Sequence, residues 1–555
     1  MFSFNILPDY LKKGKIQLWL TFIVSLLVFG ILQFSPVLAD PDSFYHARLT
    51  VLLRDFGWLR EFPWTQSSLY QRIFIDHHFG YHLLLAPFVS LWPPLVGLKI
   101  ATAVMAALTV TAVIWCLKRW AVRWWGIGLI LLLTASPLLF RLSLGKAPSL
   151  AVGAAIIGYY LITSRQLGWL FWWSWFYVWL YSAWPLLLVM AVVYMAVDSI
   201  SSYSKTIRQS AQKIPNPQSP IPNNCQSLRP NWNLELGNWN LNGFIRHFFS
   251  PTNRRLIGVI ILGYAAGLVI NPYFPTNLWY LRQLFTMALV AYNDFLAIGA
   301  EWYPYNPFEL ASNLALAGGI WFLLTVMAVI NFKRQAVLTR TTWWLTLIFL
   351  AYTLRARRQV EYLAPWLVLS SGLMWRDLWP VIVRPGVMAE LDSWLPQFLK
   401  GKIFKYFLAS YLIILLPIGL WRGGSEAYNG LRAGFKLNKY QAVTTWLRQN
   451  TPSRSIIFQS DWSNFPVLWY NDLHNYYLTG LDQTFMYEYD RDKYWLWQAA
   501  AAGEKRNLYD IARYNFGASY ILLDRDYPKM LLWLNRDKRF KKVYSDQEAI
   551  IYALD

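Results

Sequence analysis

The sequence is poor in cysteine and in charged residues. Two cysteines occur among its 555 residues, Cys116 inside an apolar run and Cys225 in a polar stretch, so we expect neither a disulfide nor a cysteine-ligated metal site. Charged residues make up only 15% of the chain, which excludes an ordinary soluble protein of this length. The sequence also shows no lipidation motif and no internal repeat.

Apolar and aromatic residues dominate instead. Hydrophobic residues make up 56% of the chain and aromatic residues 18%, with 32 tryptophans. Apolar stretches long enough to cross about 30 Å of hydrocarbon recur along the first three quarters. The net charge of +21 would suit a nucleic-acid-binding protein. However, Lys and Arg gather in short segments between apolar runs, as in cytoplasmic loops. The sequence predicts a polytopic α-helical membrane protein that binds no nucleic acid.

We expect about eleven membrane spans. They lie at about 17–37, 94–117, 124–140, 148–164, 168–182, 184–198, 256–272, 309–331, 342–354, 360–376 and 404–421. The first run is too long for a signal peptide. The odd number of spans places the two ends of the chain on opposite faces of a cell (inner or plasma) membrane.

The distribution of basic residues predicts the orientation. A cytoplasmic N-terminus places the most basic segments inside, in agreement with the positive-inside tendency. These segments are 1–16, 118–123, 165–167, 199–255, 332–341 and 377–405. The loop 38–93 and the tail 422–555 then face the exterior. Within the cytoplasmic loop 199–255, the stretch 199–245 is rich in Pro, Asn, Gln and Ser, so we expect disorder there.

The tail 422–555 has the pattern of a small α/β domain, whereas residues 1–421 form the membrane domain. "SIIFQSD" and "ASYILLDRD" predict short buried strands that end in acidic turns. "KYQAVTTWLRQN" predicts a helix that Thr451 and Pro452 terminate. "KKVYSDQEAIIYAL" predicts a final hairpin. We expect this domain to lie outside the membrane.

Two carboxylates follow the first span, where the chain leaves the membrane. Asp40 and Asp42 precede an amphipathic helix that is expected to begin near Ser43. A carboxylate there can cap the helix and lie in its positive dipole field. A pair of carboxylates beside an apolar wall can also act as a general base or bind a metal. Both interpretations remain open for each residue.

The same outer loop contains a cluster of histidines in "IDHHFGYH". Asp76, His77, His78 and His82 fall within seven positions. His78 and His82 are spaced i, i+4, so a helix would place them on one face, and Asp76 could complete a site for a divalent ion. The alternative is that these histidines only form hydrogen bonds at the membrane boundary. Phe79 follows His78, so the zinc protease signature HExxH is absent.

"DPDSFYHARL" (40–49) and "DHHFGYHLLLAPF" (76–88) resemble the first extracytoplasmic loop of the GT-C superfamily of integral-membrane glycosyltransferases. The likeness is to catalytic subunits of oligosaccharyltransferases, and to bacterial lipid-linked-sugar transferases related to protein O-mannosyltransferases. The oligosaccharyltransferase motif Trp-Trp-Asp-Tyr-Gly is absent, and "SDWSNFP", with Asp461 and Trp462, comes nearest to it. N-glycosylation of Asn-X-Ser/Thr therefore stays open.

The resemblance implies a polyprenyl-phosphate or pyrophosphate sugar donor and assigns roles to several residues. An acidic residue of the first outer loop would be the catalytic base or a metal ligand, which by position is Asp42, with Asp40 second. "RARRQVEYLAP" resembles the late outer loop that holds the donor phosphate. Glu301 corresponds to an acidic residue that a further outer loop contributes to the site. It lies in "NPYFPTNLWYLRQLFTMALVAYNDFLAIGAEWYPYNPFEL", where we expect a surface helix followed by an irregular loop. The alternative is that Glu301 only caps or solvates this loop.

Arg355, Arg357 and Arg358 are also unusual by charge alone, since they lie in a short outer loop against the positive-inside tendency. Either they reach lipid headgroups or pair with Glu361, or they bind the donor phosphate, which suits the planar guanidinium group. Arg141 and Lys146 form a second outer basic pair that could assist.

Together these features predict an inverting glycosyltransferase that transfers a sugar from a polyprenyl-phosphate donor to an extracytoplasmic protein, lipid or glycan. No cofactor is assigned with certainty. If a metal takes part, we expect Mg²⁺ or Mn²⁺ on oxygen ligands from Asp40, Asp42, Asp76 and Glu301. The alternatives are a lipid-linked glycan transporter (flippase), which usually carries ionisable groups at mid-membrane and paired halves, and a non-catalytic envelope scaffold.

Overall fold

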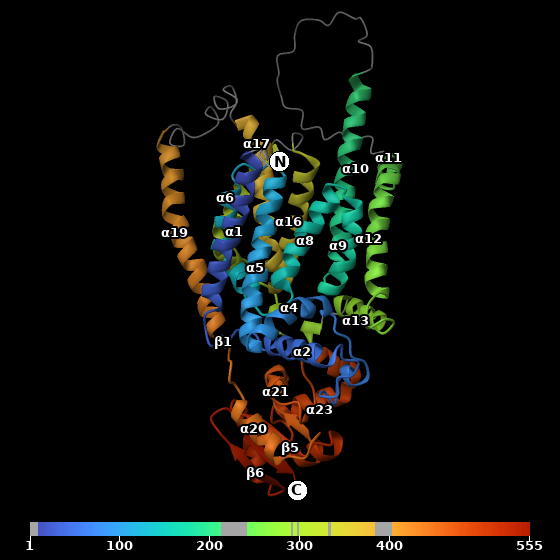
Figure 1. Cartoon of the computed structure of the whole chain (residues 1–555), viewed down its shortest axis with the longest axis vertical. Coiled ribbons are helices and arrows are strands. Elements are labelled where there is room, and N and C mark those ends of the chain that lie inside the picture. The colour runs from blue at the N-terminus through green and yellow to red at the C-terminus, as the bar shows by residue number, and fades with distance from the viewer. Residues whose placement is uncertain are drawn as a thin grey trace, which may run out of the picture.

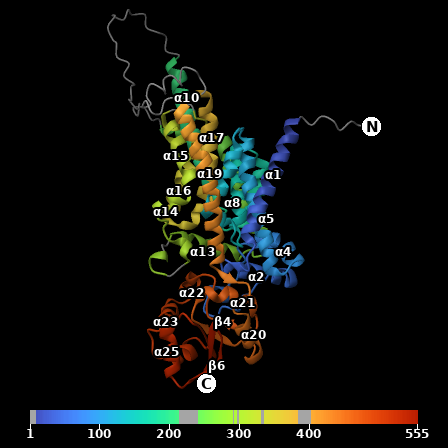
Figure 2. The ribbon, with the colours of Figure 1, turned by 90° about the vertical axis from the view of Figure 1, so that its left-hand side faces the viewer.

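A computed structural model describes residues 9–212, 241–289, 292–296, 299–330, 335–382 and 402–554. A bundle of long helices lies above a small domain that contains a β-sheet (Figure 1). The helices run along the long axis of the molecule in both views, and the start of the first helix lies far from the sheet (Figures 1 and 2).

The bundle reproduces the predicted apolar segments as helices. Each predicted span falls on one helix or on a pair of helices that meet at a bend. The single helices are α1 (Asp9–Gln33), α5 (Pro94–Arg119), α8 (Pro148–Thr163), α9 (Leu167–Leu180), α10 (Leu186–Gln212), α12 (Pro251–Val269), α16 (Val337–Arg355), α17 (Val360–Ile382) and α19 (Lys402–Arg432). The bent pairs are α6 (Trp125–Thr134) with α7 (Ser136–Leu142), and α14 (Pro307–Asn313) with α15 (Ala315–Ile330).

The number of membrane spans is lower by a strict test of length and hydropathy. Gly14–Gln33 and Pro94–Arg119 are long and apolar enough to cross a membrane, and up to four spans result if each bent pair counts as one. This test covers only the described residues. The predicted number of eleven spans is therefore not confirmed.

The outside of the bundle carries large apolar side chains that face away from the protein. On α1, Trp19 is 66% exposed and Ile31 67%. On α15, Phe322 and Leu323 are each 62% exposed. Folded proteins in water rarely leave such surfaces uncovered, so the exterior of the bundle suits a lipid environment.

The polar stretch 199–245 is partly helical, in contrast to the disorder that its composition predicts. Helix α10 continues to Gln212, and α11 (Leu241–Phe248) forms before α12. Extending an existing helix adds one hydrogen bond for each residue that is fixed, so polar residues can prolong α10 without a new nucleus. Residues 213–240 lie outside the described part of the chain.

The C-terminal domain has the predicted α/β pattern. Its sheet has the order β4-β3-β5-β7-β6, in which β3 is parallel to both β4 and β5. The strands are β3 (Ile456–Gln459), β4 (Tyr476–Tyr477), β5 (Tyr520–Asp524), β6 (Phe540–Ser545) and β7 (Ala549–Leu554). Strands β6 and β7 form the expected antiparallel hairpin, and α20 (Gln441–Asn450) is the expected helix.

The sheet domain is tied to the chain that leaves the first helix. The strand β1 (Val37–Leu38) pairs antiparallel with β2 (Phe435–Lys436). The helix α2 (Asp42–Phe56) packs against α21 (Phe465–Asn471) of the sheet domain. These contacts fix the segment between β1 and α2, which contains Asp40 and Asp42, at the junction between bundle and domain.

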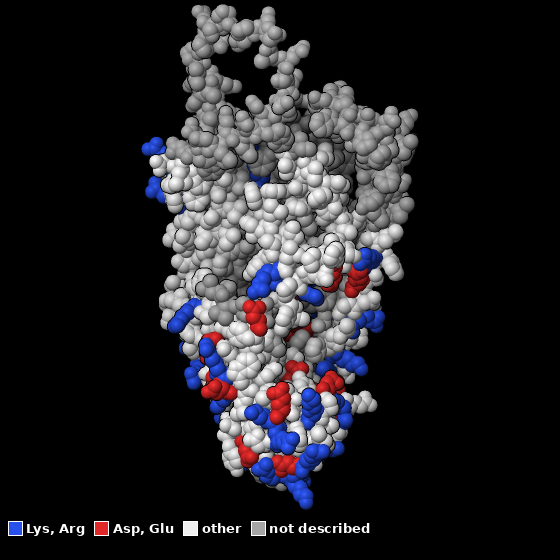
Figure 3. Space-filling view, turned by 180° about the vertical axis from the view of Figure 1, so that it is seen from behind, with Lys and Arg blue, Asp and Glu red and all other residues white. Residues whose placement is uncertain are grey.

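Short helices fill the layer between the bundle and the sheet domain. They are α2, α3 (Leu69–Arg72), α4 (Phe79–Leu91) and α13 (Asn277–Leu289), and Figure 1 shows α2, α4 and α13 there. Helix α13 is the surface helix that the sequence predicts before Glu301. Viewed from behind, charged side chains crowd the sheet domain and the junction, whereas uncharged residues cover most of the described bundle surface (Figure 3).

Candidate functional site

A cavity of about 1280 Å³ lies at the junction between bundle and sheet domain. Its wall includes the start of α2, the segment after α7, the turn with Glu301, and residues of α16 and α17. The sheet domain contributes the segment that follows β3, with Asp461 and Trp462. Ligands of α/β sheets bind beyond the carboxyl ends of parallel strands, which is where this segment lies.

The two predicted carboxylates share one lysine. The ammonium group of Lys146 lies 2.7 Å from Asp40 and 2.8 Å from Asp42. Helix α2 begins at Asp42, and Asp40 accepts a hydrogen bond from the Asp42 backbone N–H at 2.8 Å. Asp40 therefore accepts from the first residue of α2, although the N-cap position itself is Pro41. The Asp40 side chain is 18% exposed, whereas that of Asp42 is 35% exposed. Of the two, Asp42 has the freer carboxylate.

Gly145 lets the segment after α7 approach α2 closely enough for this contact. A Cβ at this position would lie 2.7 Å from a methyl group of Leu98 and 2.8 Å from the Ser43 hydroxyl. A Cβ at residue 145 would therefore force Leu98 and Ser43 to shift in the layer that holds Lys146 beside the two carboxylates.

We expect Gly145→Ala to lower the thermal unfolding midpoint of the purified protein, because overpacking a filled site costs about 1–3 kcal/mol. The matched control is Gly126→Ala, at a position where a Cβ meets no atom within 4 Å. An unfolding midpoint for Gly145→Ala equal to that of the control would show that the segment can move at no cost.

A second ion-pair cluster joins four segments of the bundle. The guanidinium group of Arg141 pairs with Glu301 and, at 2.8 Å, with Glu361. Arg358 pairs with the other oxygen of Glu301 at 3.1 Å and donates to the Tyr181 hydroxyl at 2.6 Å. All five residues line the cavity.

Each cation in these two clusters keeps donors for a further partner. Lys146 has three N–H donors and uses two of them on carboxylates, and the Nε of Arg358 has no hydrogen-bond partner within the described residues. The acidic partners hold these cations in fixed positions. The cations can therefore stabilise an incoming anion without having to move first.

The three arginines of the late outer loop have different surroundings. Only Arg358 lines the cavity. Arg357 is exposed, lies 3.8 Å from Glu309 and donates to the Pro304 carbonyl. Arg355 is exposed at the end of α16. The structure thus gathers Asp40, Asp42, Arg141, Lys146, Glu301 and Arg358 at one cavity and leaves Arg355 and Arg357 outside it.

Part of the histidine cluster forms a hydrogen-bonded chain. The Asp76 carboxylate contacts His82 Nδ1 at 2.7 Å, and His82 Nε2 contacts His46 Nδ1 at 2.8 Å. His78 precedes the first residue of α4, and its carbonyl accepts the His82 backbone N–H at 3.1 Å. The rings of His78 and His82 both lie beside that of His46, with centroids 5.6 Å and 5.0 Å away, and the His78 ring also stacks on Tyr181.

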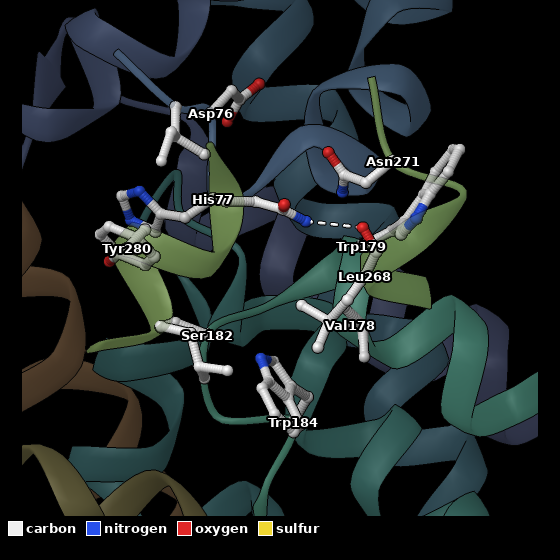
Figure 4. A pocket seen from close by; sticks show the side chains of 12 residues that line it. Asp76, His77, Val178, Trp179, Ser182, Trp184, Leu268, Asn271 and Tyr280 are labelled. Atoms are coloured by element: carbon white, nitrogen blue, oxygen red, sulfur yellow. Dashed lines mark hydrogen bonds between the residues drawn. The ribbon is translucent and has the colours of Figure 1, made fainter. Parts of the chain in front are cut away.

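A smaller cavity of about 40 Å³, shown in Figure 4, shares His77 with the main cavity. The His77 ring stacks on Tyr280, with centroids 4.8 Å apart, and both residues line the two cavities. Burial lowers the pKa of His77 to about 4 and that of His78 well below its usual range. Both rings are therefore neutral at physiological pH.

The arrangement does not fit a divalent metal ion. Asp40 and Asp42 bind Lys146, Glu301 binds two arginines, and Asp76 accepts from His82 and from the His78 backbone. Among the described residues, no group of three or more His, Cys, Asp or Glu side chains is placed to hold a metal. A metal would have to displace these cations, so we route no step through one.

Lys99, which belongs to none of the motifs in the sequence, positions the site. Its ammonium group donates to the carbonyls of Gln33, Ser35 and Val37 and so fixes the chain between α1 and Asp40. A buried lysine inside an apolar run is itself a signal, because such charges are costly and seldom without a role.

Comparison with known proteins supports the fold. No family model and no curated sequence matches the chain. The oligosaccharyltransferase AglB from Archaeoglobus fulgidus, in complex with an inhibitory peptide and a dolichol-phosphate, matches with a TM-score of 0.58 and 13% identity, over 98% of this chain and 74% of that one.

Two further solved structures are similar to this chain. ArnT from Cupriavidus metallidurans, bound to undecaprenyl phosphate, has a TM-score of 0.52 and 11% identity, covering 96% of this chain and 97% of ArnT. The arabinofuranosyltransferase AftD from Mycobacteria has a TM-score of 0.53 and 14% identity, covering 97% of this chain and 40% of AftD. The chain therefore has the fold of the GT-C membrane glycosyltransferases, which confirms the resemblance seen in its sequence.

Proposed function

We propose that this protein is an inverting glycosyltransferase that transfers a sugar from a polyprenyl-phosphate or pyrophosphate donor to an acceptor held under the sheet domain. The observation that carries the proposal is the meeting of the Asp42 carboxylate with Lys146, Arg141 and Arg358 in one cavity. A carboxylate can activate an attacking group, and fixed cations can stabilise a departing phosphate. AglB and ArnT, which share the fold, have been captured with dolichol-phosphate and undecaprenyl phosphate respectively.

The cavity also has a place for the lipid part of such a donor. Its wall continues along Val189 of α10 and along Ile348 and Tyr352 of α16. These side chains are 45%, 41% and 50% exposed, so this part of the wall opens to the outside of the bundle. An isoprenoid chain could lie there against apolar surface while its phosphate reaches Arg358.

In the proposed reaction, Asp42 takes the proton of the attacking group. That group forms a bond to the anomeric carbon, and the bond from this carbon to the phosphate oxygen breaks with inversion. Arg358, Arg141 and Lys146 stabilise the charge that develops on the departing phosphate. We place the base at Asp42 rather than Asp40, because the Asp40 carboxylate already accepts the Asp42 backbone N–H and is the less exposed of the two.

The pH dependence should report the state of Asp42. Burial raises the pKa of this carboxyl group to about 6, against the opposing effect of Lys146 and with smaller increases from Asp40 and Glu301. A base must be deprotonated, so kcat/KM should be constant above this pH and fall as the pH drops through about 6. Lys146→Gln should move this fall in kcat/KM to higher pH, since the Lys146 ammonium group favours the ionised form of Asp42. A fall in kcat/KM near the ordinary pKa of a carboxyl group would contradict the assignment of Asp42 as the base.

Mass spectrometry of the donor distinguishes the enzyme from a flippase. Purified protein in lipid vesicles would receive a panel of polyprenyl-phosphate and pyrophosphate sugars together with extracted membrane acceptors. The proposal expects cleavage of the sugar–phosphate bond of one donor and an equal amount of glycosylated product. Movement of intact donor across the vesicle membrane, without cleavage, would favour the transporter.

A further inference from the structure

Two adjacent polar residues of the sheet domain, Asp482 and Gln483, line the cavity and have no part in the proposed reaction. They lie where the chain enters the short helix α22 (Gln483–Tyr489). Gln483 is 2% exposed, and Asp482 forms no ion pair within the described residues. By contrast, the four carboxylates of the two ion-pair clusters each contact a lysine or an arginine. Asp482 is thus a carboxylate at the cavity without a cationic partner in the described chain.

The backbone before α22 holds the two side chains in place. Leu481 has a φ of +68°, a left-handed conformation that residues other than glycine rarely adopt. A Cβ at Gly480 would overlap the ring of Phe465, so the segment is packed tightly. Asp482 then accepts the Thr484 backbone N–H through Oδ1 at 2.9 Å. Strained backbone persists only where the surrounding structure maintains it, and it is common at ligand sites.

A hydrogen bond to a buried tyrosine orients the side-chain amide of Gln483. The Tyr494 hydroxyl, on a residue that is 1% exposed, donates to Gln483 Oε1 at 2.6 Å. The amide nitrogen Nε2 keeps both of its N–H donors, which have no hydrogen-bond partner within the described residues. Buried amide groups are nearly always hydrogen-bonded, so these donors are available to a molecule bound in the cavity.

Asp482 lies near the arginine that is proposed to hold the donor phosphate. Burial raises the pKa of the Asp482 carboxyl group above its ordinary value, while the hydrogen bond from Thr484 and the charge of Arg358 lower it and so favour the ionised form. Burial also raises the pKa of the Tyr280 hydroxyl, which Asp482 raises further and Arg358 lowers. Charges act on a pKa in this way over short distances. A sugar bonded to a phosphate at Arg358 would therefore lie within reach of Asp482.

The pair offers complementary hydrogen-bonding groups at adjacent positions. The carboxylate of Asp482 only accepts hydrogen bonds, whereas the N–H groups of Gln483 only donate. A hydroxyl group can do both, so two neighbouring hydroxyls of a sugar match the pair. Phe485 and Tyr70 also line the cavity, with ring centroids 4.6 Å apart, and offer apolar surface to the C–H groups of a sugar ring. A sugar that carries its own carboxylate would be repelled by Asp482.

We propose that Asp482 and Gln483 bind adjacent hydroxyl groups of the sugar that is transferred, and that they select a neutral sugar over an acidic one. This inference rests on the proposed function and names the class of donor: a polyprenyl phosphate or pyrophosphate that carries a neutral sugar with two adjacent free hydroxyl groups. The bundle holds the phosphate, and the sheet domain recognises the sugar. No bond forms or breaks at either residue, so both determine specificity.

The test is the binding of matched donor pairs to full-length protein in nanodiscs. The pairs are glucosyl and glucuronosyl, mannosyl and mannuronosyl, and galactosyl and galacturonosyl undecaprenyl phosphate, with undecaprenyl phosphate as the sugar-free reference. The two members of a pair share lipid and phosphate, so effects at Arg358 cancel in the ratio of their affinities. We expect the neutral member of at least one pair to bind at least about tenfold more tightly than its acidic partner, because like charges that face each other are costly.

Two variants test the residues themselves. Asp482→Asn should reduce this preference to less than about threefold, since asparagine can still cap α22 but carries no charge. Gln483→Leu should weaken binding of the neutral donor by about two- to tenfold, the usual effect of losing a neutral hydrogen bond, and leave undecaprenyl phosphate binding unchanged. The matched controls are Asp492→Asn and Gln441→Leu, at exposed positions of the sheet domain that do not line the cavity, and neither should change any affinity. Unfolding midpoints would be measured on the same preparations.

Equal affinities within every pair for wild-type protein, or a preference for an acidic sugar, would overturn the inference. So would a wild-type preference that persists in both Asp482→Asn and Gln483→Leu. The proposed function survives these results if wild-type protein still cleaves a donor. Wild-type protein that cleaves no donor would overturn the proposed function, and the role of the two residues with it.

Discussion

Asp42→Asn should lower kcat/KM for sugar transfer by about 10²–10⁴-fold, the usual contribution of a positioned general base. The amide keeps the size of the carboxylate but cannot take a proton. It also cannot balance Lys146, which lies 2.8 Å away and would keep, among the described residues, only Asp40 as a carboxylate partner. Donor binding should change much less, since the proposed phosphate contacts come from other residues. Initial rates and donor affinity would be measured on the same purified preparation.

Asp55→Asn is the matched control for this prediction. Asp55 lies on the same helix, is exposed, and pairs only with the neighbouring Arg54 among the described residues. Exposed ion pairs contribute little, so neither rate nor stability should change noticeably. If Asp42→Asn kept wild-type activity while Asp40→Asn lost it, the base would have to be assigned to Asp40.

Arg358→Ala should weaken the binding of polyprenyl phosphate by about 10–100-fold, because a hydrogen bond to a charged group contributes about 1.5–3 kcal/mol. Within the described part of the chain, the substitution also leaves Glu301 with Arg141 alone as an arginine partner, and it removes the donor to the Tyr181 hydroxyl. Arg358→Lys should recover part of the affinity, since it restores the charge but not the planar fork. Binding of undecaprenyl phosphate to protein in nanodiscs measures this directly.

Arg355→Ala provides a comparison within the same loop. The sequence assigns the donor phosphate to all three arginines, whereas in the structure Arg355 is exposed and does not line the cavity. We expect its loss to change donor affinity less than threefold. Equal losses of affinity in Arg355→Ala and Arg358→Ala would favour the sequence-based prediction that both arginines bind the donor phosphate. The donor would then have to bind at least partly outside this cavity.

Local patterns in the sequence predicted much of the fold. Apolar runs predicted the helices of the bundle, short apolar runs that end in acidic turns predicted β3 and β5, and "KKVYSDQEAIIYAL" predicted the final hairpin. These patterns depend on residues close together in the chain, so they can be recognised without the structure. The same reasoning missed the helical ends of the stretch 199–245, because composition does not report whether a neighbouring helix will continue.

The site depends on contacts that no local pattern contains. Arg141 meets Glu361 and Glu301 across 220 and 160 positions of the sequence. The sequence suggested Arg141 as an assisting residue, but it could not show that these acids would hold it. Likewise, the spacing of His78 and His82 suggested a shared helix face, whereas the partner of His82 is His46 on another helix. Such pairs form only when the packed helices bring distant segments together.

The most direct test of the central claim is label transfer in native membranes. Membranes that hold wild-type protein, Asp42→Asn or Asp55→Asn would be incubated with polyprenyl-phosphate sugars that carry a labelled sugar. The account predicts that label passes from one of these donors to a membrane acceptor with wild-type and Asp55→Asn protein, and that Asp42→Asn abolishes the transfer at equal expression. Transfer that is unchanged by Asp42→Asn, or absent with wild-type protein for every donor, would contradict it.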